Sequence, residues 1–542
     1  MPRGDERTVL IVGAGPTGLT LAIELARRGI IPRLVDRAPG PSAFVKASEL
    51  QPRTLEILED IGLVDRAMAM GTPIRRLELR AEGRSLMDVD FGHLDAPYPM
   101  KLGLGQVRTE HILSDELWRL GGGIERETRL VGLEETDAGV LAELIEPDGV
   151  ARRAEFAYVV CCDGARSTVR GLLGLALEGE TFPEEWILGD VRIEWDMPRD
   201  VQVAFMTGAG DEGTITCQPL PGERYQVAAP RTISPGAPES SDRPTLPELQ
   251  DRFDRVADLP GRIHDPVWLT SYRVHQRTAA SLVIGRVILA GDAGHLSSPV
   301  GGVGMNTGIQ DAYNLGWKLA LAIEGAAAAG LVASYEAERK EAAARTLAFS
   351  ARGHRIQTMG GAVRKELRNH AMRLLSRIDA PGDANFREQS QTSLGYRESP
   401  IVDEDHGVLS VVHRGPRAGD RVPDAHPVRT EEGPDRRLFQ LLRGTGFDVL
   451  VIPPKDPDPG ALERLRAVGA AVGRRSRLRG YVVDGPRVEG LGRIADPTGA
   501  LRTRLGARGE AMFVVRPDGY IGMRAHRADP TSLADHLAGI LR

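Results

Sequence analysis

The chain has 542 residues with a formal net charge of −6; 41% of its residues are hydrophobic and 27% are charged. The length corresponds to roughly three to four domains, and the composition is that of an ordinary globular protein rather than a disordered or fibrous one. Lys and Arg residues are spread along the chain instead of clustering, which gives no indication of nucleic-acid binding.

Residues 8–36 predict a strand, a tight turn, an amphipathic helix and a second strand. The turn carries a GxGxxG motif, in which Gly13 permits the tight turn, Gly15 lets the backbone approach phosphate groups and Gly18 allows close helix packing. The helix N-terminus then presents free N–H groups to a pyrophosphate, and Asp36 can accept the ribose hydroxyl groups of an adenosine. The dinucleotide-binding residues expected here are Gly13, Gly15, Pro16, Thr17, Gly18, Asp36 and Arg37.

A second GxGxxG match, at residues 208–213, predicts a hairpin loop instead. Asp211 and Glu212 would repel a pyrophosphate, and a strand-like segment follows in place of a helix. Short alternating segments around this loop predict an antiparallel sheet over residues 185–284. Phe205, Met206 and Cys217 in this sheet are candidates for lining a pocket, although alternation alone more often indicates core residues.

The second half of the chain divides at about Ser399. Residues 285–398 contain a long Ala-, Leu-, Arg- and Glu-rich stretch that predicts helices, whereas helices and strands alternate beyond it. The predicted domain organisation is a first domain in two parts, 1–184 and 285–398, an inserted domain at 185–284 and a C-terminal domain at 399–542.

A second glycine-rich segment, residues 291–306, follows another predicted buried strand. Asp292 at the end of this strand can bind a ribityl hydroxyl group of FAD, or alternatively cap a helix. Gly301, Gly302 and Gly304 leave bare backbone for a flat ring, and a helix from Asn306 directs its positive end at the N1–C2=O edge of a reduced flavin. Together, the two glycine-rich segments predict a permanently bound FAD.

The start of the chain lacks the apolar core of a signal peptide. The apolar stretch 317–335 contains Lys318 and Glu324, so it predicts a helix rather than a membrane span. The three cysteines form no CxxC pair and are expected to be buried thiols rather than a redox or metal site. We therefore expect a cytoplasmic protein with no membrane partner and no metal.

Several ordered motifs resemble those of the class A flavoprotein aromatic hydroxylases, the FAD monooxygenases of the para-hydroxybenzoate hydroxylase type. Besides the two glycine-rich segments, these motifs are Arg53–Leu58, Gln106–Glu110, Cys162–Arg170 and Asp311–Lys318. Gly415–Asp420 and Val515–Gly519 resemble the C-terminal domain of the phenol and polyketide hydroxylase branch. The resemblance spans essentially the whole chain. It implies an α/β fold: a Rossmann-like FAD-binding domain, an inserted antiparallel-sheet substrate domain and a thioredoxin-like C-terminal domain.

The resemblance implies a monooxygenase that uses NADPH or NADH and O2 to hydroxylate a phenolic or polycyclic, polyketide-like aromatic molecule through a flavin C4a-hydroperoxide. The protein's part is orientation, electrostatics and the exclusion of water. A homodimer is compatible with the resemblance. The further cofactor-binding residues that it implies are Lys46, Gln106, Leu130, Asp163, Gly164, Asp292, Pro299, Gly302, Gly304, Met305 and Asn306.

The chain departs from the family pattern at three places. Lys46 stands where an Arg is usual, which keeps the positive charge but loses the planar fork, so the handling of nicotinamide is expected to differ. Gly294 and Val303 replace an Ala and a Gln, and both changes are expected to be tolerated. The C-terminal domain has no cysteine, which excludes a thioredoxin-like redox role and favours packing or oligomer contacts.

The base that deprotonates the substrate is not identified by the sequence. Tyr272, Arg273 and His275 precede the second glycine-rich segment and are candidates for substrate contact, or alternatively strand residues with satisfied hydrogen bonds. With Pro299, expected beside the reactive edge of the flavin, they form the predicted catalytic set. His295 is expected to be structural.

Two alternative functions stay open. A Baeyer–Villiger or ring-opening oxygenation on the same scaffold would show the same motifs, and a non-catalytic FAD-binding scaffold is the non-enzyme alternative. A flavin halogenase would need a Trp-x-Trp-x-Ile motif, which the sequence lacks. A bulky polycyclic substrate is favoured over a simple phenol.

Overall fold

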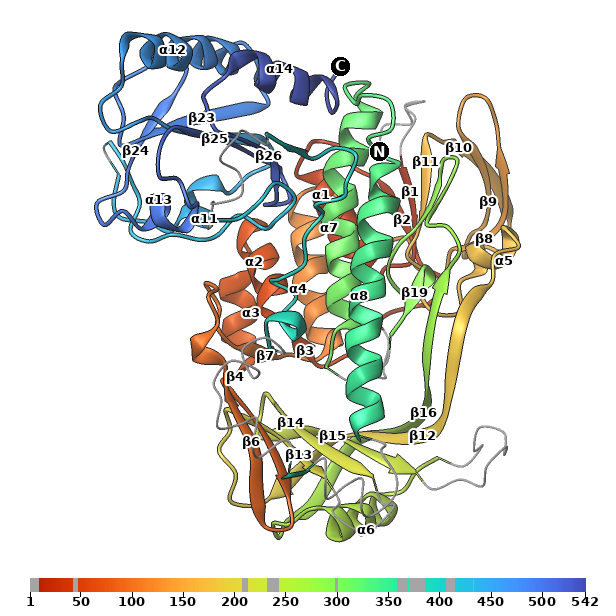
Figure 1. Ribbon diagram of the computed structural model, residues 1–542. Coiled ribbons are helices and arrows are strands. Elements are labelled where there is room, and N and C mark those ends of the chain that lie inside the picture. The colour runs from red at the N-terminus through yellow and green to blue at the C-terminus, as the bar shows by residue number, and fades with distance from the viewer. Residues whose placement is uncertain are drawn as a thin grey trace.

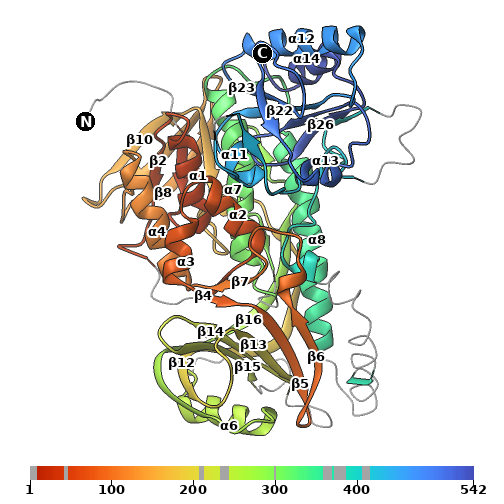
Figure 2. The same ribbon diagram turned by 90° about the vertical axis from the view of Figure 1, so that its left-hand side faces the viewer.

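The computed structural model describes residues 9–41, 47–206, 213–231, 243–297, 301–357, 369–370, 386–405, 415–431 and 433–542. Figure 1 shows a central unit with a parallel sheet, an antiparallel sheet at one end and a C-terminal unit at the other. Two long helices, α7 (Gly304–Ile323) and α8 (Ser334–Gln357), pack against each other, and α8 reaches down to the antiparallel sheet (Figures 1 and 2). Within the described ranges, no helix has the length and apolarity needed to cross a bilayer.

The central unit is built on a five-stranded sheet whose last four strands are parallel. Most residues of this sheet are buried, whichever face their side chains point to, as expected of a parallel sheet that is covered on both sides. The predicted strand, turn, helix and strand at 8–36 are confirmed. In order across the sheet, the strands are β17 (Val283–Ile284), β18 (Val287–Leu289), β11 (Tyr158–Cys161), β1 (Val9–Val12) and β2 (Arg33–Val35).

Helices cover one side of this sheet, and a three-stranded antiparallel sheet lies on the side away from them (Figure 1). The helices are α1 (Pro16–Ala26), α4 (Gln106–Arg119) and α7, and the strands are β8 (Arg129–Glu135), β9 (Val140–Ile145) and β10 (Ala151–Phe156). Shorter elements complete the unit: α2 (Pro52–Asp60), α3 (Val64–Met70), α5 (Thr168–Leu172), and a small sheet of β3 (Glu49–Leu50), β7 (Lys101–Gly103) and β4 (Thr72–Ile74).

The second sheet has eight strands, and all neighbours in it run antiparallel except β13 and β5. Its order is β19 (His295–Leu296), β16 (Arg262–Ala279), β12 (Leu177–Glu194), β15 (Arg224–Arg231), β14 (Thr214–Leu220), β13 (Val201–Met206), β5 (Arg76–Ala81) and β6 (Arg84–Asp90). The predicted antiparallel sheet is therefore present but larger than expected. It begins at Leu177, and the β5–β6 hairpin joins it from the segment assigned to the first domain. The predicted hairpin loop at 208–213 falls mainly outside the described residues, between two strands that pair antiparallel.

Side chains alternate between the two faces of this sheet. Phe205 and Cys217 belong to a core cluster with helix α6 (Leu246–Val256), whereas Met206 lies on the other face, which is turned toward the central unit. Successive residues of a strand point to opposite faces of the sheet, so Phe205 and Met206, which are neighbours on β13, lie on different faces. All three pocket candidates are buried, and of the three Met206 alone lines the cavity.

The C-terminal unit contains a mixed seven-stranded sheet, as the predicted alternation of helices and strands implies. The sequence β22–α12–β23 forms a parallel crossover and β25–β26–α14 a hairpin followed by a helix, an order compatible with the expected thioredoxin-like unit. Across the sheet the strands are β20 (Asp403–Glu404), β26 (Ile521–Ala525), β25 (Ala511–Val515), β22 (Phe447–Ile452), β23 (Leu478–Val483), β24 (Gly492–Ala495) and β21 (Arg429–Thr430). The helices are α11 (Leu438–Leu442), α12 (Pro459–Gly473), α13 (Ala500–Arg504) and α14 (Pro530–Ala538).

Candidate active site

Strand β1 ends in a turn with no room for side chains. Gly13 has a φ of +105°, and a Cβ there would lie 2.3 Å from the carbonyl oxygen of Cys162, while a Cβ on Gly18 would lie 2.0 Å from that of Gly13. Gly15 differs, because nothing lies within 4 Å of its Cβ position. Bare backbone facing open space at the N-terminus of α1 is the environment that a pyrophosphate needs.

Asp36 directly follows β2 and is fixed beside this turn. Its two carboxylate oxygens accept the backbone N–H groups of Ala14 at 2.7 Å and Ala38 at 2.8 Å, and Arg126 lies 3.6 Å away. Each oxygen of a carboxylate has a further lone pair. Asp36 is therefore oriented by the chain and retains the capacity to accept ribose hydroxyl groups, while Arg37 next to it is exposed.

The segment after β11 adds an acceptor to the same region. Oδ2 of Asp163 accepts the N–H groups of Thr168 at 2.7 Å and Val169 at 3.3 Å, which caps α5. Oδ1 of Asp163 is buried and has no hydrogen-bond partner among the described residues. Gly164 has a φ of +80° and faces open space. A buried acceptor without a partner is costly, so this segment is suited to a bound hydrogen-bonding group.

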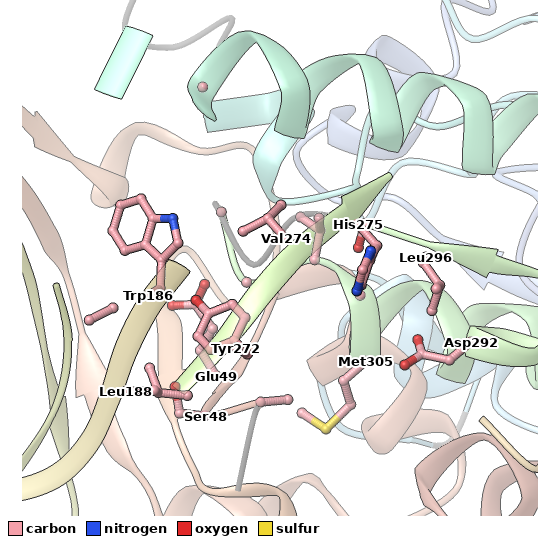
Figure 3. Close-up of a pocket in the computed structure, with 18 of the residues that line it drawn as sticks. Ser48, Glu49, Trp186, Leu188, Tyr272, Val274, His275, Asp292, Leu296 and Met305 are labelled. Carbon is pink, nitrogen blue, oxygen red and sulfur yellow. The ribbon is translucent and has the colours of Figure 1, made fainter. Parts of the chain in front are cut away.

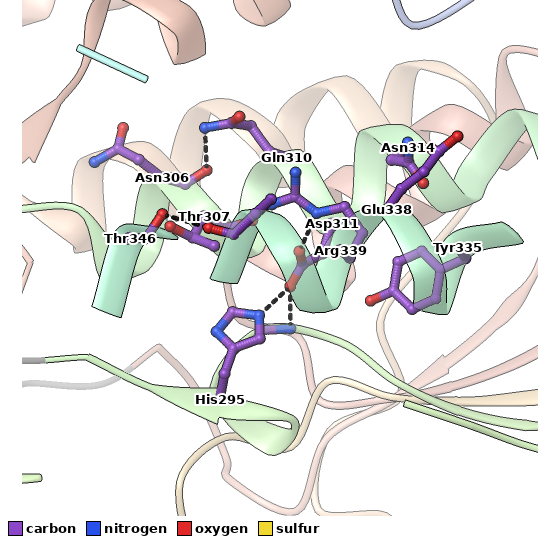
Figure 4. Close-up of polar contacts among 12 residues, drawn as sticks. His295, Asn306, Thr307, Gln310, Asp311, Asn314, Tyr335, Glu338, Arg339 and Thr346 are labelled. Atoms are coloured by element: carbon purple, nitrogen blue, oxygen red, sulfur yellow. Dashed lines mark hydrogen bonds and ion pairs between the residues drawn. The ribbon is translucent and has the colours of Figure 1, made fainter. Parts of the chain in front are cut away.

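Asp311 on α7 holds the second glycine-rich segment in place (Figure 4). Its Oδ2 accepts the N–H of Gly291 at 2.9 Å and lies 2.6 Å from Nε2 of His295, and its Oδ1 accepts from Nε of Arg339 at 2.6 Å. Burial alone would raise the pKa of Asp311, but the neighbouring His295 and Arg339 outweigh it and lower that pKa below its ordinary value. The network fixes the 3-10 helix of Gly291–Ala293, and the contact of His295 with Asp311 is consistent with the structural role predicted for it.

One cavity of about 1150 Å³ joins these elements to the inner face of the eight-stranded sheet. In Figure 3, Asp292, Met305 and Leu296 lie at one end of it, and Trp186, Tyr272 and Glu49 at the other. The predicted cofactor-binding residues that line the cavity are Gly15, Pro16, Thr17, Gln106, Gly164, Asp292, Gly302, Gly304 and Met305. The predicted catalytic residues Tyr272, Arg273 and His275 also line it. The two glycine-rich segments therefore converge on one space.

Other predicted site residues do not line this cavity. Leu130 is buried in the hydrophobic core on β8. Asn306 is fully buried and pins β3 to the glycine-rich loop, because its side chain bonds the N–H of Gln51 at 2.8 Å and the carbonyl groups of Glu49 at 3.0 Å and Gly302 at 2.7 Å. Gly13, Gly18, Asp36, Arg37 and Asp163 lie outside the cavity lining, and Lys46 and Pro299 lie outside the described residues. The ligand roles of all these residues stay predictions.

The predicted substrate contacts differ in what they can do chemically. Burial raises the pKa of the Tyr272 hydroxyl group above its ordinary value, which favours a hydrogen-bond donor over a base. Nδ1 of His275 lies 3.0 Å from Oγ1 of Thr181, so the imidazole is tied to β12. Tyr272, Arg273 and His275 all line the cavity, and the surroundings of Tyr272 argue against a role as the base.

Sequence reasoning missed the polar residues on the sheet side of the cavity. Glu49 and Lys101 line it as a buried pair, and three glutamines, Gln202, Gln218 and Gln226, line it from neighbouring strands. The one local feature that could have indicated this pair is Lys101, a charged residue inside the apolar segment around Leu102. The partners come together only through strand register, which a single sequence does not display.

The observed features fit an FAD. The N-termini of α1 and α7 both open onto the cavity, and bare backbone at Gly15 and Gly164 faces its space. The three cysteines are buried and free, and burial raises the pKa of each thiol, so they are unreactive packing residues as expected. Among the described residues, no group of three or more His, Cys, Asp or Glu side chains is arranged to hold a metal ion.

Comparisons with known proteins agree with this geometry. A family model described as an FAD binding domain matches residues 6–350. The chain is 35% identical to 6-methylpretetramide 4-monooxygenase of Streptomyces rimosus, over 99% of this chain and 94% of that protein. It is 33% identical to pentachlorophenol 4-monooxygenase of Sphingobium chlorophenolicum, over 96% and 94%. A solved ternary complex of aklavinone-11 hydroxylase with FAD and aklavinone has a TM-score of 0.77 and 26% identity, with 99% of each chain covered.

Proposed function

Because this chain belongs to the family of FAD-dependent aromatic monooxygenases, we propose that its substrate is a polycyclic, polyketide-like phenol rather than a single-ring one. The enzyme is an oxidoreductase that uses NAD(P)H, O2 and FAD to hydroxylate an aromatic small molecule, and the central unit is its Rossmann-like FAD-binding domain. FAD, when bound, supplies the oxygen-activating chemistry. The chain binds, orients and shields the reactants.

Named residues would hold the cofactor in this proposal. Gly15, Pro16 and Thr17 at the N-terminus of α1 would bind the pyrophosphate, and Asp36 the adenosine ribose. Gln106 and Asp292 would bind the ribityl chain. The backbone of Gly302–Met305 would face the flavin, and the positive end of α7 would favour negative charge on it.

The width of the cavity carries the proposal for the substrate. Six neighbouring strands, from β6 through β5, β13, β14 and β15 to β12, each contribute at least two lining residues. With ~4.8 Å between strands, this face is ~24 Å wide. A single benzene ring would leave most of it filled with water, and such a site depends on the exclusion of water. The relative named for 6-methylpretetramide and the solved complex with aklavinone support the same choice.

The test is a substrate panel with the purified, FAD-loaded enzyme. Oxidation of NADPH and of NADH is followed with hydroxyanthraquinones, larger polycyclic phenols, phenol and pentachlorophenol, and product masses are measured. We expect the higher kcat/KM with polycyclic phenols and a product that contains one additional oxygen atom. A higher kcat/KM with the single-ring phenols would contradict the proposal.

We also propose that the enzyme works in the cytoplasm. The support is indirect: its three thiols are free, and NAD(P)H is its co-substrate. Fractionation of producing cells, followed by detection of the protein in the soluble and periplasmic fractions, tests this. Enrichment in the periplasmic fraction would contradict it.

A further inference from the structure

One wall of the cavity carries a continuous chain of polar side chains. Nζ of Lys101 donates to Oε1 of Gln202 at 2.9 Å, Nε2 of Gln202 to Oε1 of Gln218 at 3.5 Å, and Nε2 of Gln218 to Oγ of Ser48 at 3.0 Å. Oγ of Ser48 in turn donates to Gln226, and Oε2 of Glu49 lies 3.7 Å from Nζ of Lys101. We call this set the polar wall: Ser48, Glu49, Lys101, Gln202, Gln218 and Gln226.

The three glutamines of the polar wall form a row across three strands. Gln218 on β14 is directly opposite Gln226 on β15, and the register of β13 with β14 continues to place Gln202 opposite Gln218. Their spacing is therefore the ~4.8 Å between neighbouring strands. A carboxamide both donates and accepts hydrogen bonds, so this row can bind hydroxyl and carbonyl oxygens along one edge of a flat polycycle.

Glu49 and Lys101 stand at the end of this row as a buried pair, with side chains 2% and 0% exposed. Oε1 of Glu49 accepts a hydrogen bond from Nε2 of Gln51 at 3.1 Å, but Oε2 has no hydrogen-bond partner among the described residues. A buried carboxylate oxygen in this state is costly unless a further donor reaches it. A hydroxyl group of a bound ligand would be such a donor.

The position of Glu49 joins the polar wall to the flavin side of the cavity. A Cβ on Gly302, whose φ is +61°, would lie 1.7 Å from Oε1 of Glu49, so the carboxylate occupies the space directly over this loop. Nε2 of Gln51 also donates to the carbonyl of Gly301 at 2.9 Å. Glu49 therefore lies between the glycine-rich loop and the rest of the polar wall. The reacting ring of a substrate that contacts both the polar wall and the flavin would lie at this boundary.

We propose that Glu49 takes the proton of the substrate phenol, that Lys101 pairs with the resulting phenolate, and that the glutamines bind the oxygenated edge of the substrate. This proposal rests on the proposed polycyclic phenol substrate. The O–H bond of the phenol breaks, its electron pair stays on the phenolate oxygen, and a new O–H bond forms on Glu49. The charge of the site is unchanged by the transfer: Lys101 is the cation throughout, and the anion is Glu49 before the transfer and the phenolate after it. A phenolate is the more electron-rich and hence more reactive ring for hydroxylation.

The electrostatic surroundings support this assignment. Burial raises the pKa of the Glu49 carboxyl group, although Lys101 opposes the shift, and a carboxylate with a raised pKa is a stronger base. Burial also lowers the pKa of Lys101, with Glu49 opposing. The other titratable or charged residues that line the cavity are Cys162, Arg166, Arg170, Tyr272, Arg273, His275, Arg277, Asp292 and Arg352.

The test counts protons when a coloured phenol binds. 2-Hydroxyanthraquinone changes colour on ionisation, so difference spectra of the FAD-loaded enzyme report how much of it binds as phenolate. A pH indicator in weakly buffered solution reports the protons released. We expect the wild type to bind phenolate without releasing a proton, because Glu49 retains it. Glu49→Gln should release one proton per phenolate formed, and Lys101→Met should bind mainly the neutral phenol.

Matched variants exclude other bases and a folding defect. Tyr272→Phe and His275→Asn should still bind phenolate without releasing a proton, and the double variant Glu49→Gln/Lys101→Met, which leaves no unpaired buried charge, should bind the neutral phenol. Proton release by the wild type, failure of the probe to bind, or release that begins with His275→Asn would each overturn the proposal. Turnover of the same compound is measured separately, so hydroxylation accompanied by proton release leaves the proposed function intact and removes only the role of Glu49.

Discussion

Asp311 carries three interactions, and each of them fixes a different part of the site. It orients the backbone of Gly291, the ring of His295 and the guanidinium of Arg339, and its own side chain is fully buried. Arg339 also donates to the hydroxyl group of Tyr396 at 2.8 Å and the carbonyl of Thr307 at 3.2 Å. A single carboxylate therefore links the loop that carries Asp292 to helices α7 and α8.

Substitution Asp311→Asn tests this link. The amide keeps the shape but leaves Arg339 without its anion, which for buried pairs costs about 3–5 kcal/mol. Because the folded-state pKa of Asp311 is lowered, its stabilising contribution is fully present above the ordinary value of ~3.9 and is lost as the pH falls through the folded-state pKa. Denaturant unfolding should therefore show a large loss of stability at neutral pH that shrinks in acid, together with loss of bound FAD.

The control is Asp115→Asn, which removes a partner of Arg66 from a surface ion pair with side chains 41% and 44% exposed. Such pairs contribute about 0–1 kcal/mol, so this variant should unfold nearly as the wild type does and retain FAD. Equal stability of Asp311→Asn and the wild type at neutral pH would show that the network is not what holds the loop.

At the scale of elements, the sequence predicted what is encoded locally. The turn after β1 needs glycines at 13 and 18 because a Cβ would collide with backbone, and this requirement is visible in the motif itself. The alternation in β13 and β14 likewise predicted strands. The β5–β6 hairpin joins the sheet through a parallel pairing of β5 with β13, a contact between segments about 120 residues apart that no local pattern specifies. The same holds for Glu49 and Lys101, so the polar wall could not be predicted.

Strand β14 offers a comparison between its two faces. Gln218 lies in the middle of the polar wall, and its neighbour Cys217 packs in the core under α6. Gln218→Leu removes side-chain hydrogen bonds worth ~0.5–1.5 kcal/mol each, so it should lower Tm, and it should also lower kcat/KM for polycyclic phenols by about tenfold. Cys217→Ala should lower Tm as well but leave kcat/KM nearly unchanged. Steady-state kinetics and thermal unfolding of both variants decide this, and an unchanged kcat/KM in Gln218→Leu would speak against the polar wall as a substrate surface.

At the scale of the whole molecule, the C-terminal unit is bound to the FAD-binding unit by buried charges. Arg516 donates to both oxygens of Glu338 on α8, at 2.7 and 2.9 Å, and to Asp518 at 2.6 Å. Lys318 on α7 donates to Glu338 at 2.7 Å. Two cations and two anions thus balance, and Trp317 packs edge-on against Phe447 beside them, with ring centres 5.6 Å apart. The expected packing role of the cysteine-free C-terminal unit is consistent with these contacts.

The buried charges of Arg516, Glu338, Lys318 and Asp518 make the stability of the two units interdependent. Arg516→Met tests this. The methionine fills much of the space but leaves Glu338 with Lys318 alone and Asp518 without its main cation, which should cost about 3–5 kcal/mol. Because Glu338 lies on the helix that also presents Arg339 to Asp311, we expect FAD to dissociate more readily, although Arg516 lines no part of the cavity. Arg487→Met, in the same unit but with an Arg side chain 80% exposed, is the matched control and should change neither property. Thermal unfolding and flavin fluorescence measure the two effects, and a loss of stability without any loss of FAD would mean that the C-terminal unit stabilises only itself.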